Sequence, residues 1–365
     1  MFKRTRRTVK RLIRFVIVGL CLLTSALLVV LVVPWHLTPH VQSDQVYATW
    51  MSEHLDPATR LVDVGMLGAH DAFAANMGLF SPLDPAAMAS GYTHALLAPP
   101  LGWLAKGFMI RQSNTQVADA TTLLQRGIRY FDIRLSRDEA WSITHNYLAP
   151  ESVTTIFEAL ADFLHEHPGE VLILDFQWVF DLAADDSFAD AATFEALLVL
   201  LDETGLMPFV VPAATTDLST VTYGEIVAKT GGSAVVLLAK TGDHGVFFNR
   251  SMHIRSTWYN TDNYDELWNQ ILIEATIIEG DPVAMDRFRV MQAVKTLQLS
   301  ESGILNSLSS WSLINRARLL NARLAEQDAL CDTLDALPIL MLDFADSNKG
   351  EALDRFMACI IERAS

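Results

Sequence analysis

Short apolar segments alternate with segments of helical periodicity from Leu61 to the end of this chain. Continuous apolar strands separated by helices are typical of a parallel sheet that is covered by helices. About eight such strands are predicted, which favours an α/β fold with a closed (β/α)8 barrel of the TIM type over an open sheet. The predicted strands cover residues 61–67, 128–135, 141–145, 171–176, 233–240, 253–259, 287–297 and 338–344, and the predicted helices include 115–126, 152–167, 188–203 and 312–330.

The N-terminus has a different pattern, in which a basic segment precedes an apolar one. Residues 1–14 contain seven Lys or Arg residues and no acid, and residues 15–33 carry no charge. At a rise of about 1.5 Å per residue, the apolar run reaches about 28 Å, close to a bilayer core. We therefore predict a cytoplasmic segment over 1–14, a single transmembrane helix over 15–33, a linker over 34–55 and a barrel over 56–365. The basic flank places the barrel outside the cytoplasm, at the cell membrane, and a cleaved signal peptide is disfavoured because no A-x-A site follows the long run.

The charge balance and the cysteines limit the partners of the chain. It has 27 basic and 43 acidic residues, and the basic ones are concentrated at the N-terminus. A strongly acidic body is a poor nucleic-acid binder, so no nucleic-acid partner is expected, and a monomer is predicted. No C-x-x-C pair exists, so a cysteine-based zinc site is not predicted. The spacing of Cys331 and Cys359 leaves open whether they pair.

Polar residues fall where the predicted strands end. In a barrel of this type, functional sites lie at the carboxyl ends of the strands. Two histidines, one arginine and several acids are therefore expected to meet there. These residues are His70, Asp71, Asp132, Arg134, His145, Asp175, Gln177, Asp343 and Asp346.

This set suits phosphodiester chemistry. One histidine can take a proton from an attacking hydroxyl and the other can protonate the leaving oxygen, because the pKa of histidine lies near neutral pH. A carboxylate bonded to each ring would hold its tautomer, and an arginine can bind a phosphate oxygen with two parallel donors. Each residue alone also has a structural reading: Asp132 and Arg134, on one face of a strand, could form an ion pair at the barrel rim, and Trp178 could belong to the core rather than to a pocket.

Four segments point to a known family. The segments GAHDAF, GIRYFDIRLS, ITHNY and HPGEVLILDF, in this order and spacing, resemble the X region of phosphatidylinositol-specific phospholipase C, in its bacterial and X-domain-only type. The resemblance covers Leu61 to about Gln177, and LMLDFAD near the C-terminus resembles the closing strand of the family. It implies a distorted TIM-type barrel and a two-histidine mechanism.

The resemblance also assigns roles to single residues. His70 matches the general base that deprotonates the inositol 2-hydroxyl, and His145 matches the general acid that protonates the diacylglycerol oxygen. Asp71 matches the carboxylate that supports the acid, and Asp343 matches the one that orients the base. Arg134 matches the phosphate-binding arginine. The substrate-binding residues are then expected to be Arg134, Asp132, Gln177 and Trp178.

The same alignment predicts catalysis without a metal or other cofactor. Calcium-dependent relatives carry two carboxylates, spaced E-x-D, on the strand where this chain has Asp132 and Arg134. A guanidinium cannot bind a cation but can replace its charge beside the phosphate, and Asp132 is expected to position it. Two positions depart from the family pattern. Asn146 follows His145 where the family usually has glycine, and Gln177 stands where bacterial members tend to carry a basic residue and calcium-dependent members a glutamate.

The resulting prediction is a membrane-anchored phosphodiesterase. It would cleave phosphatidylinositol-type lipids, its partners in the membrane, to diacylglycerol and a cyclic inositol phosphate. One alternative is a metal-dependent phosphodiesterase acting on glycerophosphodiesters or sphingolipids. A further alternative is a catalytically silent barrel that binds a phosphorylated lipid.

Overall fold

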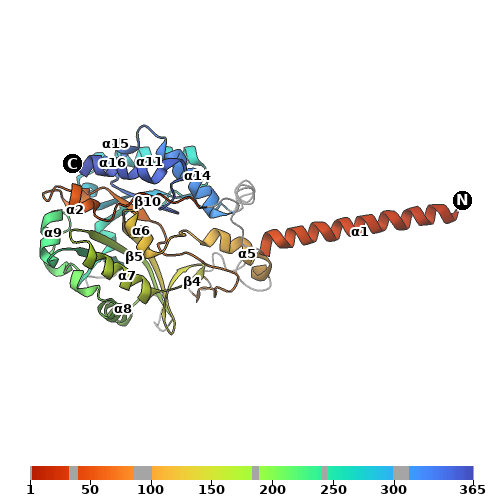
Figure 1. The fold of residues 1–365 in the computed structure, drawn as a ribbon, viewed down its shortest axis with the longest axis horizontal. Coiled ribbons are helices and arrows are strands. Elements are labelled where there is room, and N and C mark those ends of the chain that lie inside the picture. The colour runs from red at the N-terminus through yellow and green to blue at the C-terminus, as the bar shows by residue number, and fades with distance from the viewer. Residues whose placement is uncertain are drawn as a thin grey trace.

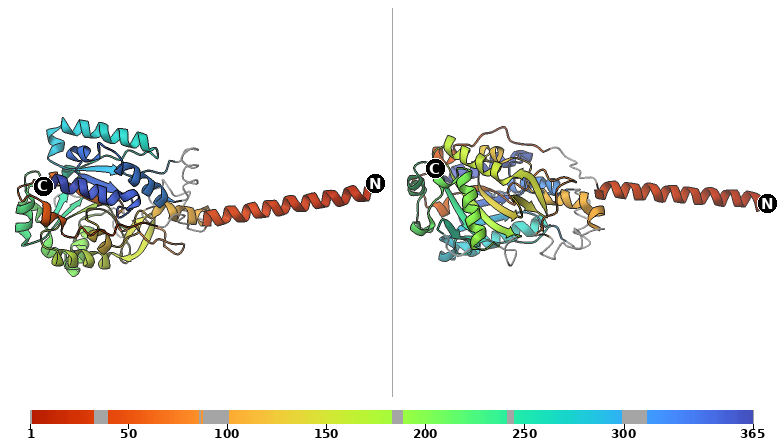
Figure 2. Two further views of the ribbon diagram at one scale, coloured as in Figure 1. Left: turned by 45° about the horizontal axis from the view of Figure 1, so that its top comes forward. Right: turned by 90° about the horizontal axis from the view of Figure 1, so that it is seen from below.

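The computed structural model describes residues 2–32, 40–85, 87, 101–182, 189–240, 245–298 and 312–364, and for residues 2–12, 30–32, 101 and 104 it describes the backbone only. One mixed sheet forms the centre of the body, helices surround it, and the N-terminal helix α1 (Phe2–Val32) projects away from it (Figures 1 and 2). The predicted α/β class is confirmed.

Eight parallel strands form the wall of a barrel, in the order β7-β6-β5-β2-β1-β10-β9-β8. Each strand except β7 pairs with the next parallel strand along the chain, and β10 returns to pair with β1, as in a TIM barrel. The strands are β1 (Met66–Ala69), β2 (Ile128–Arg137), β5 (Val171–Asp181), β6 (Ala234–Ala239), β7 (Phe247–Asn249), β8 (Ile254–Ser256), β9 (Phe288–Ala293) and β10 (Ile339–Leu342).

The barrel is open between β7 and β8, where the described residues show no pairing, so the prediction of a closed barrel is wrong at this point. The two strands have three residues each and are joined only by the four-residue helix α10 (Arg250–His253). Neighbouring parallel strands need a crossover of about a dozen residues or more, so this short connection cannot pair them. The predicted strand 253–259 accordingly shrinks to β8.

The third predicted strand forms, but outside the parallel wall. β3 (Trp141–His145) pairs antiparallel with the end of β2, and β4 (Tyr147–Ser152) pairs antiparallel with β3. The chain between β2 and β3 is too short for a crossover, so β3 must fold back as a hairpin. The hairpin returns His145 toward the middle of β2, because Leu135 pairs with Ile143.

Several predicted boundaries move in the structure. The predicted strand 61–67 is divided into a 3-10 turn (Leu61–Asp63) and β1. The predicted helix 115–126 shortens to α6 (Ala120–Gln125), because Asp119 caps its N-terminus by accepting from the Thr122 N–H. The predicted helix 312–330 shortens to α14 (Leu313–Ala325), and a second helix, α15 (Leu330–Ala336), begins at its predicted last residue.

The remaining helices cover the outside of the sheet (Figures 1 and 2). Within the predicted linker 34–55, the short helix α2 (Trp50–His54) buries Trp50 and Met51 in the core. The other helices are α5 (Leu101–Ser113), α7 (Val153–Glu166), α8 (Ala191–Glu203), α9 (Tyr223–Thr230), α11 (Tyr264–Glu279), α12 (Pro282–Met285) and α16 (Ala352–Ala364).

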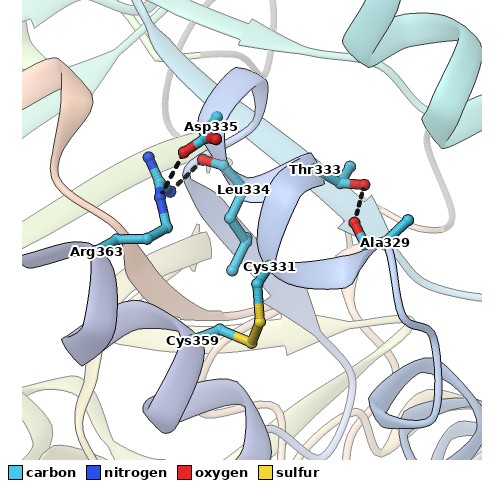
Figure 3. Close-up of a disulfide and its surroundings, with 7 residues drawn as sticks. All are labelled: Ala329, Cys331, Thr333, Leu334, Asp335, Cys359 and Arg363. Carbon is cyan, nitrogen blue, oxygen red and sulfur yellow. Dashed lines mark hydrogen bonds and ion pairs between the residues drawn. A yellow bond between two sulfur atoms is a disulfide. The ribbon is translucent and has the colours of Figure 1, made fainter.

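A disulfide joins Cys331 on α15 to Cys359 on α16, which settles the pairing that the sequence left open (Figure 3). Beside it, Arg363 forms an ion pair with Asp335, at 2.9 Å between Nε and Oδ1. The bond ties the last helix of the chain to the helix that precedes β10.

Helix α1 carries exposed apolar side chains, such as Phe15 and Leu23, among its described side chains. Among the described residues, no helix is both long and apolar enough to cross a membrane. The predicted transmembrane helix over 15–33 is therefore not supported. Its last residue, Val33, and the side chains of residues 30–32 lie outside the described part of the chain.

Candidate active site

The parallel pairing of three neighbouring strands brings the predicted residues together. His70 follows the last residue of β1, and Asp343 follows the last residue of β10. Asp132 and Arg134 lie on one face of β2, because side chains alternate along a strand. Since β1 pairs with both β2 and β10, all of these side chains meet at one end of the barrel.

His70 is surrounded by carboxylates. Its Nδ1 lies 2.8 Å from Asp343 Oδ1, and its Nε2 lies 3.6 Å from Asp71 Oδ2 and 3.9 Å from Asp132 Oδ2. Burial lowers the pKa of His70, but the charges of Asp71 and Asp343 outweigh it and raise the pKa to about 9. His70 therefore holds a proton at neutral pH in the free protein.

His145 has the opposite protonation tendency. Its Nδ1 donates to the carbonyl oxygen of Ser113 at 2.8 Å, so Nε2 points toward Asp71 Oδ2 at 3.5 Å. Burial lowers the pKa of His145, and the charge of Asp71 offsets this effect only in part. The backbone contact fixes the ring tautomer.

Asp71 connects both histidines with Arg134. The Nε of Arg134 pairs with Asp71 Oδ1, while Asp71 Oδ2 faces the two rings. Burial raises the pKa of Asp71, but Arg134 and the histidines reverse this and lower it, so the carboxyl is ionised. Its backbone has a φ of 40°, a left-handed conformation that Asp tolerates better than most residues, and Thr115 Oγ1 donates to its carbonyl oxygen at 2.9 Å.

Asp132 is buried, as Asp71 and Asp343 are. Burial raises its pKa to about 6, and the charge of Asp71 adds to the effect. The ion pair of Arg134 is with Asp71 and not with Asp132, contrary to the expected contact.

A cavity of about 540 Å³ opens over this cluster. Its volume falls within the usual range of small-molecule sites, about 300–1,000 Å³. Of the predicted residues, His70, Asp71, Arg134, His145, Gln177 and Asp343 line it. Trp178 lines two smaller adjoining hollows of about 140 Å³ and 190 Å³ instead.

A β-bulge separates Gln177 from Trp178. Ile133 pairs with Phe176 and Arg134 with Trp178, so Gln177 is an additional residue in β5. Bulges re-aim the side chains next to them. Gln177 lines both the large cavity and the 140 Å³ hollow, whereas Trp178 lines the two smaller hollows.

The remaining polar residues of the predicted strand ends have structural partners. Asp175 accepts from Tyr130 Oη at 2.6 Å and from Arg250 Nε at 2.7 Å. The buried Asp346 bonds His40 Nε2 and Gln42 Nε2, both at 2.9 Å, and thus holds the segment before α2.

The backbone conformation at Asn146 explains why asparagine can stand where the family usually has glycine. Its φ is 64°, in the left-handed region that glycine, and next to it asparagine, adopts most readily. Its Nδ2 also donates to Ser113 Oγ at 3.1 Å, beside the carbonyl that orients His145.

The sequence analysis missed further cavity residues. Lys240 directly follows β6, a position that could have been recognised, whereas Lys295 and Arg316 follow no predicted strand end. The carbonyl of Ser113 is a backbone group, for which no sequence signal exists.

Three of the site residues could also hold a metal ion. His70, Asp71 and Asp132 offer ligand atoms that all lie within 4.8 Å of one another. Only the Nε2 of His70 would serve, because its Nδ1 bonds Asp343. Arg134 on the other oxygen of Asp71 opposes a cation by its own charge. Catalysis without a metal stays a prediction.

Comparison with known proteins gives both sequence and structural relatives. No protein-family model matches the chain. The zebrafish (Danio rerio) "PI-PLC X domain-containing protein 3" is 31% identical over 142 residues, which are 37% of this chain and 43% of the relative. The human (Homo sapiens) protein of the same name is 32% identical over 139 residues, 35% of this chain and 41% of the relative. The chain is related to the PI-PLC X-domain family. It spans less than half of the length of these curated relatives.

Solved structures of bacterial PI-PLC share the fold. The phosphatidylinositol-specific phospholipase C of Listeria monocytogenes matches with a TM-score of 0.56 at 18% identity, over 87% of this chain and 98% of that chain. The Staphylococcus aureus enzyme matches with a TM-score of 0.56 at 15% identity, over 86% and 97%. At these identities the likeness shows the fold alone, and the reaction is a separate question.

Proposed function

We propose that this chain is a phosphodiesterase that cleaves phosphatidylinositol-type lipids to diacylglycerol and a cyclic inositol phosphate. One observation carries the proposal. The Nε2 atoms of His70 and His145 lie 3.6 Å and 3.5 Å from the same oxygen of Asp71, whose other oxygen pairs with Arg134, in one cavity. Two proton-transfer groups and one cation thus meet around one carboxylate, a combination that suits phosphodiester cleavage.

In the proposed reaction, His70 Nε2 removes the proton of the inositol 2-hydroxyl. That oxygen attacks phosphorus, and a new O–P bond closes the cyclic phosphate. The bond from phosphorus to the diacylglycerol oxygen breaks, and His145 Nε2 supplies the proton that this oxygen takes. Arg134 stabilises the charge on the other phosphate oxygens, while Asp343 and Asp71 hold the rings and their charged forms.

In the free protein, the order of the two histidine pKa values is the reverse of the order that their roles as base and acid call for. The base, His70, has the raised pKa, and the acid, His145, has the lowered one. A bound phosphodiester brings a negative charge next to His145 and occupies Arg134, and both effects raise the pKa of His145. Substrate binding therefore favours the protonation of the acid.

The experiment is an assay of the full chain on phosphatidylinositol in mixed micelles with excess chelator. We expect cleavage that His70→Ala and His145→Ala each reduce by about 10²–10⁴-fold, the usual contribution of a general acid or base. His165→Ala, at an exposed position on α7, is the matched control and should keep full activity. Absence of cleavage with or without calcium would contradict the substrate assignment.

The grouping of His70, Asp71 and Asp132 favours a second candidate, a metal-dependent phosphodiesterase acting on glycerophosphodiesters or sphingolipids. The same assay separates the two. Cleavage that disappears in chelator and returns with a divalent cation would support this second candidate and refute the first.

The cellular location remains part of the proposal. We predict a monomer at the cell membrane with its body outside the cytoplasm, next to its phospholipid substrate. Fractionation of expressing cells, with protease treatment of intact cells, tests it. Recovery in the soluble fraction, or a body protected from protease, would contradict the predicted location.

A further inference from the structure

One short segment, residues 113–116, lies between the loops that follow β1 and β10. It begins at the last residue of α5 and ends before α6. Thr115 Oγ1 donates to the carbonyl oxygen of Asp71 at 2.9 Å, and the carbonyl oxygen of Thr115 accepts from the N–H of Phe344 at 2.7 Å. The segment therefore joins the loop that carries Asp71 to the loop that carries Asp343.

Gln116 makes the same connection with its side chain. Its Nε2 donates to the carbonyl oxygens of His70 at 2.9 Å and of Leu342 at 3.2 Å, and its Oε1 accepts from the N–H of Ala345 at 3.1 Å. Two carbonyls need a donor and one N–H needs an acceptor, so these contacts fix the orientation of the amide. Gln116 is fully buried, so the loss of its amide would leave buried backbone groups without a partner.

The three backbone groups surround the pair of His70 and Asp343. The N–H of His70 donates to the carbonyl oxygen of Leu342 at 3.0 Å, which extends the pairing of β1 and β10 by one residue. Asp343 lies between Leu342 and Ala345, the two positions that Gln116 bonds on the second loop. One side chain thus fixes the backbone on both sides of Asp343 relative to the backbone of His70.

We propose that Gln116 is a positioning residue for the reaction, whose amide sets the distance of 2.8 Å between the His70 ring and the Asp343 carboxylate. Gln116 acts through these two residues and not on the substrate, because its side chain is buried behind the residues that line the cavity. A misplacement of about 1 Å can cost about 10²-fold in rate, so a small shift of either loop is sufficient. As to the reaction, this inference rests on the proposed function, whereas the hydrogen bond of His70 can be observed without a substrate.

The test compares Gln116→Met, which keeps the length of the side chain and removes its amide, with a matched control. The control is Ser233→Ala, because Ser233 is also buried and its Oγ bonds two carbonyl oxygens, of Leu164 at 2.9 Å and of His167 at 3.1 Å. Ser233 directly precedes β6, so it lies at the opposite end of the barrel from the site. Both substitutions should lower the Tm by about 2–5 °C, because each leaves buried carbonyls without their donor.

The kinetic measurement uses phosphatidylinositol in mixed micelles with excess chelator. Gln116→Met should lower kcat by about 10–100-fold and change KM by less than about threefold, because it displaces the base without altering the wall of the cavity. Ser233→Ala should keep the kcat and KM of the unaltered protein. An equal loss of kcat in both variants, or a rise in KM with kcat unchanged, would refute the positioning role.

The NMR measurement needs no substrate. In the full chain with ¹⁵N-labelled histidine, we expect a downfield signal from the proton on His70 Nδ1, because this proton is bonded to the Asp343 carboxylate. Asp343→Asn identifies the signal. Gln116→Met should move it upfield or broaden it by exchange with water, and Ser233→Ala should leave it in place. An unchanged signal in Gln116→Met would refute the proposal.

The two proposals fail in different ways. A shifted His70 signal in Gln116→Met, without cleavage of lipid by the unaltered protein, would keep the positioning role and refute the reaction. Equal cleavage by the unaltered protein and Gln116→Met would refute the positioning role and leave the reaction intact. If Gln116→Met does not fold, Gln116→Glu replaces it. A carboxyl group carries at most one proton, so this variant loses at least one of the two carbonyl partners, and the same outcomes apply.

Discussion

His70 Nδ1 lies 2.8 Å from Asp343 Oδ1, although the two residues are 273 positions apart in the chain. The contact exists because β10 returns to pair with β1 and so places the first residues after both strands side by side. Asp343 thereby raises the pKa of His70.

This relationship predicts the alkaline side of the pH profile. If His70 is the base and His145 the acid, the active form has a neutral His70 and a protonated His145. The fraction of the protein in this form is constant between the two pKa values and declines above the higher one. We expect kcat/KM to fall above a pKa of about 9. Asp343→Asn removes a negative charge, so the pKa of His70 falls and this limb moves to lower pH.

The profile of both proteins is measured over pH 5–10, with the His70 ring followed by NMR. Asp335→Asn, which alters an exposed ion pair at the far helix α15, is the control. An alkaline limb that stays in place in Asp343→Asn would show that Asp343 does not tune the base.

A second prediction concerns Arg134. Arg134→Lys keeps a positive charge near Asp71 but loses the two parallel donors, so kcat should drop by about 10²–10³-fold while the protein stays folded. Arg134→Met leaves the buried Asp71 without this cation and should also lower the free energy of unfolding by about 3 kcal/mol. Assays and urea denaturation of both variants are compared. Equal stability of the two variants would argue against the ion pair with Asp71.

The left-handed backbone of Asn146 gives a third prediction. Asn146→Gly should keep the fold and most of the activity, because glycine adopts a φ of 64° without strain. Asn146→Val should lose about 2 kcal/mol or more of stability and displace His145, since a β-branched side chain is strained there and the bond to Ser113 is lost. Thermal unfolding and the lipid assay check both variants. A Val variant as stable as the Gly variant would contradict this.

The disulfide gives a fourth prediction. Cys331 and Cys359 are separated by 28 positions, and closing a loop of this length is worth about 3–4 kcal/mol in the chain-entropy model. The double substitution of both cysteines by serine should lower the free energy of unfolding by about this amount and leave kcat unchanged, because the bond lies away from the cavity. Reductant should destabilise the unaltered protein and not the double variant. If reductant affects both equally, the bond does not provide the stability.

The sequence predicted the positions of the buried strands β5, β6 and β10 well, because a buried strand needs a continuous apolar run. It could not predict the opening at β7 and β8, because three-residue strands leave too short a pattern to be separated from the helix between them. The site was predictable where chemistry depends on side chains after strands, as for His70 and Asp343. It was not predictable where a backbone carbonyl orients a ring, as Ser113 does for His145, or where a cavity residue such as Lys295 falls inside a predicted strand that ends earlier, at Ala293.

The shared carboxylate of Asp71 has a consequence for how such a protein can change in evolution. Substitutions at His70, Arg134 and His145 all alter the surroundings of one buried charge, so the free-energy effects of these substitutions will not add. No single one of them converts the site to another reaction.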